Sequence, residues 1–213
     1  MLPRSSMNKK LIDGRIDLRI IHDKSVNTWR KHTNYWEDCN RCNLAGKRHR
    51  VSFYRGVVPC DVLFIGEAPG QAEDICGRPF VGYAGHLLQD ILKQVSEDVK
   101  FTFAITNLVS CIPLRWSSET KQYEVEEPTE TEIASCSVKL AECVYLADPK
   151  LVVLMGYHAK EWYPRGVGKL FPKIPVIDIT HPTHLLDQLS PTKELLIDNI
   201  VLKLIKTICT HIK

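Results

Sequence analysis

The amino-acid sequence predicts an α/β fold of three layers, in which a central four-stranded parallel sheet carries helices on both faces. Four short segments are apolar and rich in β-branched or aromatic residues, which is typical of buried parallel strands. Amphipathic segments of helical length alternate with them, and this alternation predicts βαβ units with right-handed crossovers. The expected strands cover residues 61–66, 101–109, 151–156 and 175–181, and the expected helices cover residues 85–98, 129–148, 157–164 and 193–208.

The segment before the first strand is expected to form a helical N-terminal arm over residues 1–38. Charged residues there are interspersed with apolar ones such as Ile20 and Trp29, which suits one or two amphipathic helices between residues 11 and 37. A length of 213 residues is usual for one α/β domain. We therefore expect a single domain over residues 1–213, with the arm as part of it.

The composition is that of an ordinary globular protein and restricts the function classes. Hydrophobic residues make up 44% and charged residues 25% of the sequence, which argues against disorder. The formal net charge of +3 neither requires nor excludes a nucleic-acid partner. Because the sequence contains no run of about 18 apolar residues and no apolar signal core, we expect no membrane insertion, no secretion and a cytoplasmic location.

Three loops follow expected strands at the edge where open α/β sheets bind ligands. They contain GEAPG after the first strand, TN near the end of the second and HP after the fourth. The GEAPG loop has neither the Gly-Lys-Ser/Thr of a P-loop nor the GxGxxG dinucleotide fingerprint, which excludes both nucleotide-cofactor sites. Its glycines allow the backbone to approach a ligand closely. On spacing alone, a purely structural turn explains them equally well.

Longer motifs surround these loops and occur in a fixed order along the chain. The first is GEAPG-x-x-ED-x-x-G-x-PFVG-x-AG-x-LL over residues 66–88, the second is ITNLVSC over residues 105–111, and the third is HPTHLL over residues 181–186. Together they resemble the motifs of the family 4 uracil-DNA glycosylases, the iron–sulfur branch of the uracil-DNA glycosylase superfamily. The resemblance covers most of the chain from about Cys39 onward. It implies a uracil-DNA glycosylase-like fold and an enzyme that removes uracil from DNA.

The resemblance extends to four of the eight cysteines. Cys39 and Cys42 are similar to the family's CxxC, and Cys111 and Cys136 fall where its third and fourth cluster ligands belong. Four thiolates suit a [4Fe-4S] cluster with a structural role. Zinc is the alternative, although a zinc ribbon typically has a second CxxC about 15 to 20 residues after the first, which this sequence lacks. The other thiols, expected to be small buried or spare groups, are Cys60, Cys76, Cys143 and Cys209.

The resemblance implies that three residues bind a uracil flipped out of the DNA. Phe80 offers a ring on which the base stacks, and Glu73 lies against C5, where bulk excludes the methyl group of thymine. The amide of Asn107 donates to O4 and accepts from N3–H. Cytosine presents the opposite groups, so it would leave buried polar atoms unpaired. Considered alone, Phe80 also suits a core position and Asn107 a cap or turn.

Two further residues are implied to act in catalysis. His181 of the HP motif donates a hydrogen bond to uracil O2, where negative charge develops as the glycosidic bond breaks. The carboxylate of Glu67 orients or deprotonates water and stabilises the oxocarbenium-like sugar.

Contacts to the DNA backbone are expected from two places. Gly82 and Gly85 lie at the start of a helix, where backbone amides bind phosphate. Arg48 belongs to the basic run over residues 47–50, which suits a phosphodiester contact or a solvated turn equally well.

Two departures from the family leave a second function open. Cys136 follows Cys111 by 25 positions, in a loop that is longer than the family's and lacks its PPGNR-like motif. The HP motif also lacks the basic residue that commonly follows it. The alternative is therefore a catalytically inactive DNA-binding or replication-interaction module on the same fold. The joint presence of Glu67, Phe80, Asn107 and His181 favours an active enzyme of base excision repair. We expect it to be monofunctional, because the recognised motifs contain no lysine that could form a Schiff base. We expect it to act as a monomer on uracil-containing DNA, single- or double-stranded.

Overall fold

The computed structural model describes residues 28–212, so residues 1–27 of the expected N-terminal arm lie outside the described residues. The helices are α2 (Trp29–Trp36), η2 (Asn43–Gly46), α3 (Gln71–Cys76), α4 (Tyr83–Asp98), α5 (Glu130–Ala147), α6 (Tyr157–Arg165), η3 (Val167–Leu170), α7 (Pro182–Leu186) and α8 (Thr192–His211). The strands are β1 (Arg55–Gly56), β2 (Val62–Gly66), β3 (Phe103–Asn107), β4 (Leu114–Ser117), β5 (Gln122–Val125), β6 (Leu151–Met155) and β7 (Val176–Ile179). Among the described helices, none is both long and apolar enough to cross a membrane.

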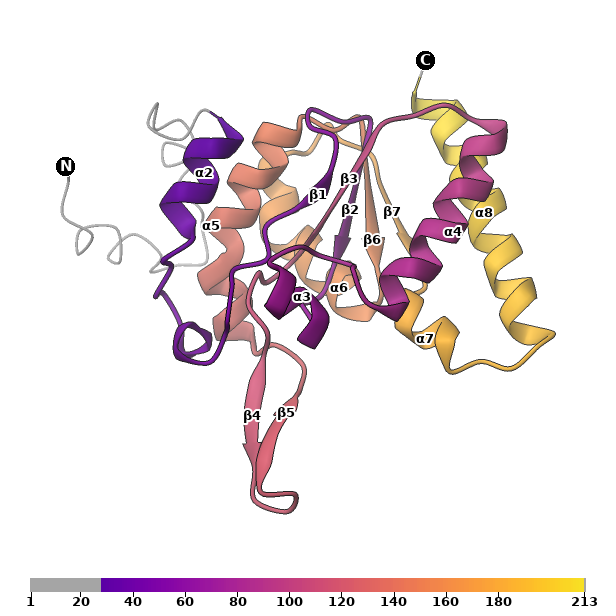
Figure 1. Cartoon of the computed structure of the whole chain (residues 1–213). Coiled ribbons are helices and arrows are strands. Elements are labelled where there is room, and N and C mark those ends of the chain that lie inside the picture. Colours follow the sequence, from indigo (N-terminus) through magenta and orange to yellow (C-terminus); the bar gives the residue numbers. More distant parts are fainter. Residues whose placement is uncertain (1–27, 213) are drawn as a thin grey trace.

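The central sheet has five strands in the order β1-β3-β2-β6-β7 (Figure 1). The four expected strands correspond to β2, β3, β6 and β7 and are parallel, whereas β1 pairs antiparallel with β3 at the edge. The expected all-parallel sheet of four strands is therefore incomplete, and the sheet is mixed. Strand β1 has only two residues, which is too short to produce a periodic pattern in the sequence.

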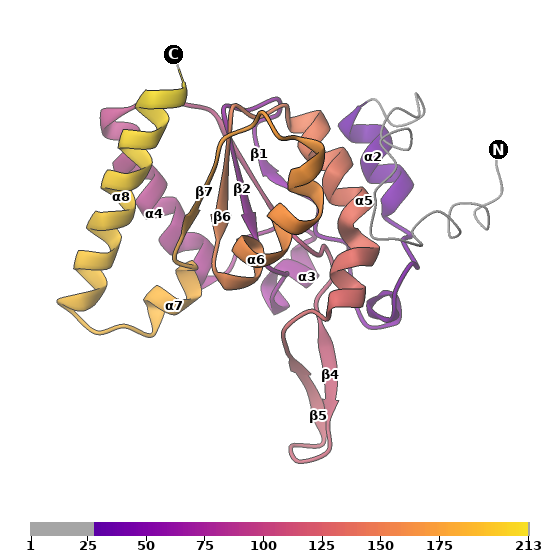
Figure 2. The same ribbon diagram turned by 180° about the vertical axis from the view of Figure 1, so that it is seen from behind.

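Helices cover both faces of the sheet, which confirms the three-layer architecture (Figures 1 and 2). Successive side chains of β2 point to opposite faces of the sheet. Leu63 and Ile65 pack with α5 and α6, and Val62 and Phe64 pack with α4 and α8. Because both sides of the strand are buried, its sequence is continuously apolar instead of alternating.

Strand order determines where a ligand can bind. The chain passes from β2 to β3 on one side of β2 and then returns to β6 on the other side. Such a reversal of direction opens a crevice at the carboxyl ends of the strands. The GEAPG, TN and HP motifs lie at this edge, because they stand at or just after the carboxyl ends of β2, β3 and β7.

Two kinds of element were not expected from the sequence. The short helices α3 and α7 directly follow the loops after β2 and β7. The long segment between Cys111 and Cys136 contains an antiparallel hairpin, β4–β5, which projects beyond the carboxyl-end edge of the sheet (Figure 1). Strand β4 is mostly half-buried and β5 is mostly exposed, so neither has the continuous apolar pattern by which a buried strand is recognised.

Candidate functional site

A cavity of about 340 Å³ lies at the carboxyl ends of the parallel strands. The loops after β2 and β7, the end of β3 and the two ends of the hairpin form its wall. Every residue predicted to bind uracil or to catalyse its excision lies in this wall. The lining residues are Glu67, Ala68, Pro69, Gly70, Glu73, Phe80, Ala84, Asn107, Pro113, Val125, Glu126, His181 and Thr183.

Asn107 provides an unsatisfied hydrogen-bonding group in the wall. It ends β3, is only 2% exposed, and its Oδ1 has no hydrogen-bond partner among the described residues. The neighbouring backbone is held in place, since the amide of Leu108 donates to the carbonyl of Gly66 at 2.9 Å. A buried acceptor without a donor costs about 1–3 kcal/mol. The Asn107 oxygen is therefore suited to accept from an N–H group of a ligand.

The ring of Phe80 lies next to this amide and is held by an unusual backbone. Phe80 has a φ of 55°, in the left-handed region that residues other than glycine rarely adopt. A Cβ on Gly66 would lie 2.5 Å from Oδ1 of Asn107 and 2.7 Å from the ring of Phe80, so only glycine fits there. Such strain at a ligand-facing residue is typical of functional sites. Phe80 also packs in the core on the α4 side.

Glu73 binds the glycine-rich loop from inside. Its Oε1 accepts hydrogen bonds from the amides of Val81 and Gly82, both at 2.8 Å, and its Oε2 accepts from the amide of Gly70 at 3.1 Å. These bonds connect the start of α3 to the loop that carries Phe80. Glu73 therefore has a direct structural role, and its predicted contact with C5 of a base stays a prediction.

Gly82 and Gly85, which were expected to present amides to a phosphate, have structural roles within the protein. The amide of Gly82 donates to Glu73. A Cβ on Gly85 would overlap the carbonyl of Phe80, so Gly85 is needed for close packing of the loop against α4. Phosphate binding by Gly82 and Gly85 stays a prediction, and the amide of Gly82 already has a partner.

Glu67 follows β2 directly and lies beside a histidine from another element. Nε2 of His158, on α6, is 3.9 Å from Oε2 of Glu67 and 3.2 Å from Oε2 of Glu127. Burial raises the pKa of Glu67, the positive charge of His158 lowers it, and the negative charge of Glu127 raises it. No sequence motif includes His158. Its position after β6, at the ligand-binding edge of the sheet, is the one signal that would have pointed to it.

His181 has a defined orientation at the N-terminus of α7. Its Nδ1 accepts a hydrogen bond from the amide of Thr183 at 3.2 Å, so the neutral ring carries its proton on Nε2. Burial lowers the pKa of His181 to about 4, which keeps the ring neutral near physiological pH. The ring centroid is 5.7 Å from that of Phe80. His181 thus offers an N–H donor next to the aromatic surface.

The four predicted ligand cysteines lie on three segments of the chain: Cys39 and Cys42 follow α2, Cys111 follows β3 and Cys136 lies on α5. Burial raises the pKa of Cys42 and raises that of Cys111 to about 11, and the charges of Cys39 and Cys136 add to both shifts. Cys39 and Cys136 thus each lie within electrostatic range of both Cys42 and Cys111. Within residues 28–212, no group of three or more His, Cys, Asp or Glu side chains is arranged to hold a single metal ion.

A buried cation lies near these thiols. Lys139 follows Cys136 by about one turn of α5, is 3% exposed, and its Nζ has no hydrogen-bond partner among the described residues. Its charge lowers the pKa of Cys111, against the larger effect of burial. A buried ammonium without a partner is unfavourable, so a negative group is expected nearby. An iron–sulfur core held by four thiolates would supply that charge, and the donor set fits such a group.

The basic run over residues 47–50 is mostly bound within the protein. Nζ of Lys47 donates to the carbonyl of Leu114 at 2.9 Å, and Nη2 of Arg48 lies 3.4 Å from the carbonyl of Glu37. The contact between Arg48 and the DNA backbone stays a prediction.

Comparison with known proteins agrees with this geometry. The family model described as "Uracil DNA glycosylase superfamily" matches residues 54–204. The type-4 uracil-DNA glycosylase of Thermotoga maritima is 32% identical over 162 residues, which are 70% of this chain and 78% of that protein. The type-4 uracil-DNA glycosylase of Sulfurisphaera tokodaii is 33% identical over 136 residues, which are 64% of this chain and 58% of that protein. The type-4 uracil-DNA glycosylase of Saccharolobus solfataricus is 33% identical over 124 residues, which are 58% of this chain and 53% of that protein. The matched region thus spans little more than half the length of the latter two relatives. The chain belongs to the uracil DNA glycosylase superfamily.

Proposed function

We propose that the protein is a monofunctional uracil-DNA glycosylase, which hydrolyses the N-glycosidic bond of a flipped deoxyuridine and leaves an abasic site for base excision repair. One observation carries the proposal: the unpartnered amide oxygen of Asn107 lies in one cavity with Phe80, Glu67 and His181. The names of the type-4 relatives support it. The whole chain is proposed to work as one domain and as a monomer, in the cytoplasm with uracil-containing DNA.

Recognition of uracil follows from the hydrogen-bonding groups of the wall. The orphaned Oδ1 of Asn107 accepts from N3–H, and the Nδ2 group donates to O4. Because cytosine lacks the N3 proton and carries an amine at C4, both pairs fail and buried polar groups are left unsatisfied. The base stacks on Phe80. Glu73 fixes the glycine-rich loop beside the base and provides the bulk against a methyl group at C5.

In the proposed mechanism His181 acts on the uracil side of the C1′–N1 bond, and Glu67 acts on the sugar side. As C1′–N1 breaks, the electron pair moves into uracil, and Nε2–H of His181 stabilises the charge that develops on O2. Glu67 orients the water that adds to C1′ and accepts its proton. The pKa of Glu67 is raised by burial, which makes its carboxylate a stronger base than one in water.

The absence of a lysine from the cavity wall supports the monofunctional assignment. A glycosylase that also cuts the backbone forms a Schiff base with an amine nucleophile. The described residues that line the cavity include no lysine, so water is the proposed nucleophile.

We propose that Cys39, Cys42, Cys111 and Cys136 hold a [4Fe-4S] cluster. Four cysteine thiolates are the usual ligand set of such a cluster, and Cys39 and Cys136 interact electrostatically with both Cys42 and Cys111. The cluster would connect the segment after α2, the segment after β3 and α5, and its role would be structural. Zinc remains the alternative occupant.

The proposal is tested with an oligonucleotide that carries one uracil. After incubation with the protein, alkali cleaves the strand at any abasic site. Asn107→Ala should lose the cleavage. Gly46→Ala serves as the matched control, because an added methyl group there meets nothing within 4 Å. A strand with thymine at the same position tests specificity.

Cleavage that is restricted to uracil and absent from Asn107→Ala supports the enzyme. A protein that binds the strand but cleaves none of these substrates would contradict the proposal and favour the inactive DNA-binding module.

A further inference from the structure

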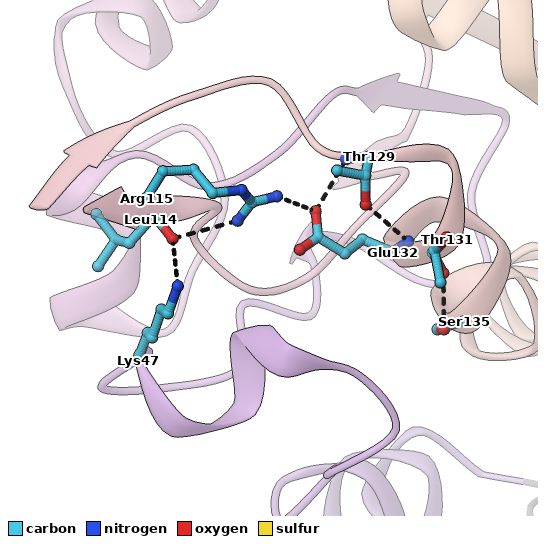
Figure 3. A network of polar contacts seen from close by, with 7 residues as sticks. All are labelled: Lys47, Leu114, Arg115, Thr129, Thr131, Glu132 and Ser135. Carbon is cyan, nitrogen blue, oxygen red and sulfur yellow. Dashed lines mark hydrogen bonds and ion pairs between the residues drawn. The ribbon is translucent and has the colours of Figure 1, made fainter. Parts of the chain in front are cut away.

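The β4–β5 hairpin is a firmly anchored projection at the rim of the candidate site. It extends from the carboxyl-end edge of the sheet in both views (Figures 1 and 2). Arg115 forms an ion pair of 2.6 Å with Glu132 of α5, whose carboxylate is buried, and Lys47 donates to the carbonyl of Leu114 (Figure 3). Glu132 also accepts from the amide of Thr129 at 2.9 Å. The base of the hairpin is thus fixed to two different parts of the fold.

The two faces of the hairpin differ in chemistry. Trp116 pairs with Tyr123 and Leu114 pairs with Val125, so these four apolar side chains lie on one face. The other face carries the alternate residues Arg115, Ser117, Gln122 and Glu124. The hairpin therefore has one aromatic face and one polar face.

The aromatic face is open to solvent. Trp116 is 57% exposed, Tyr123 is 53% exposed and Val125 is 45% exposed. The rings of Trp116 and Tyr123 lie edge to face, with their centroids 5.4 Å apart. Nζ of Lys47 lies 5.5 Å from the centroid of Tyr123, so a positive charge borders the rings. Exposed aromatic rings beside a cation are typical of surfaces that bind single-stranded nucleic acid.

The same face continues into the cavity. Val125 ends β5 and lines the cavity together with Pro113 and Glu126, which flank the hairpin. Val125 therefore joins the cavity to the aromatic face. A strand that left the cavity on this side would bring its next bases to Tyr123 and Trp116.

We propose that the Trp116–Tyr123 face binds unpaired bases of the DNA strand next to the flipped nucleotide, by stacking. That the bound strand is DNA with a flipped deoxyuridine rests on the proposed function. Open base faces are needed for stacking, and the bases of a duplex are covered by their neighbours. The hairpin therefore favours uracil in single-stranded DNA, or in a duplex that is locally open, over uracil in a closed duplex.

Binding to uracil-free DNA tests the hairpin separately from catalysis. Fluorescence anisotropy is measured with a labelled single strand of thymine nucleotides and with the same strand annealed to its complement. Trp116→Ala and Tyr123→Ala should each weaken single-strand binding about tenfold, with a much smaller effect on the duplex. Trp116→Phe keeps a ring and should retain most of the affinity. Gln122→Ala, on the polar face, is the matched control.

Turnover gives the second readout. The alanine variants should have a lower kcat/KM than the wild type on a long single strand with one uracil. They should match the kcat/KM of the wild type on a uracil trinucleotide, which is too short to reach the hairpin. Variants that bind and cleave long single strands as the wild type does would overturn the proposal, as would an equal loss of affinity for single strand and duplex. A wild-type dimer that Trp116→Ala dissociates in light scattering would assign this face to self-association instead. Failure of the wild type to excise uracil would count against the proposed function, and the anisotropy comparison would still decide the role of the hairpin.

Discussion

Nε2 of His158 lies 3.9 Å from Oε2 of Glu67 and 3.2 Å from Oε2 of Glu127, so one imidazole lies between two carboxylates from different parts of the chain. The pKa of Glu67 is raised by burial, lowered by the charge of His158 and raised by Glu127. A carboxylate that acts as a base must be ionised, so the acid limb of the pH–rate profile reports this pKa. Removing the charge of His158 and removing the charge of Glu127 should therefore shift the acid limb in opposite directions.

Replacing His158 by Gln should move the acid limb of kcat/KM to higher pH. The variant removes a positive charge that favours ionised Glu67, so the pKa of Glu67 rises. A shift of roughly half a pH unit is expected, since a partly exposed ion pair contributes up to about 1 kcal/mol. Glu127→Gln removes a negative charge and should move the limb to lower pH. Shifts of both variants in the same direction would show that the electrostatic coupling is assigned wrongly.

Asn107→Asp should lower uracil excision by about a hundredfold or more and allow some release of cytosine. A carboxylate accepts from the amine of cytosine but cannot donate to uracil O4 while it is ionised. Release of each base from otherwise identical single strands gives the measurement. Wild-type discrimination between uracil and cytosine in this variant would remove Asn107 from base recognition.

Cys136→Ala should lose iron and visible absorbance, whereas Cys209→Ala should keep both. Cys136 is a buried thiol on α5, and Cys209 is an exposed thiol on α8. Iron and zinc per chain are measured by elemental analysis after purification without oxygen. If Cys136→Ala kept its full iron content, another residue would have to supply the fourth ligand.

Lys139→Met should stabilise the metal-free protein and lower the reduction potential of the proposed cluster. The metal-free protein should gain about 1–3 kcal/mol in the free energy of unfolding, because a buried ammonium without a hydrogen-bond partner is replaced by an apolar chain of similar length. The proposed cluster should become harder to reduce, because a nearby positive charge is removed. Chemical denaturation and redox titration measure the two effects. An unchanged reduction potential would place Lys139 outside the electrostatic range of the cluster.

Gly66→Ala should disrupt the pocket, in contrast to Gly46→Ala. A Cβ on Gly66 would lie within 2.7 Å of both the Asn107 amide and the Phe80 ring, whereas one on Gly46 meets nothing within 4 Å. We expect a loss of stability of about 1–3 kcal/mol for Gly66→Ala, as for other overpacked sites, and a large loss of kcat. Thermal unfolding and single-turnover excision give the two quantities. Equal behaviour of the two variants would mean that the loop adapts freely.

Much of the fold and of the pocket could be predicted because the relevant signals are local. Continuous apolar segments mark the strands that are buried on both faces, and amphipathic segments mark the helices between them. The motif residues Glu67, Asn107 and His181 stand at or just after strand ends, so a parallel sheet brings them to one edge. The chain's place in the glycosylase superfamily likewise follows from short motifs in order.

What the sequence by itself determined is therefore the alternation of elements, the parallel core of the sheet and the residues at its ligand-binding edge. Only the tertiary structure decided that His158 lies beside Glu67, that the carboxylate of Glu73 is occupied by backbone amides, and that the loop after Cys111 forms an aromatic hairpin. The physical reason is the same in each case. These contacts join segments far apart in the chain, or elements too exposed to leave an apolar pattern, so they depend on packing geometry that no local period of the sequence encodes.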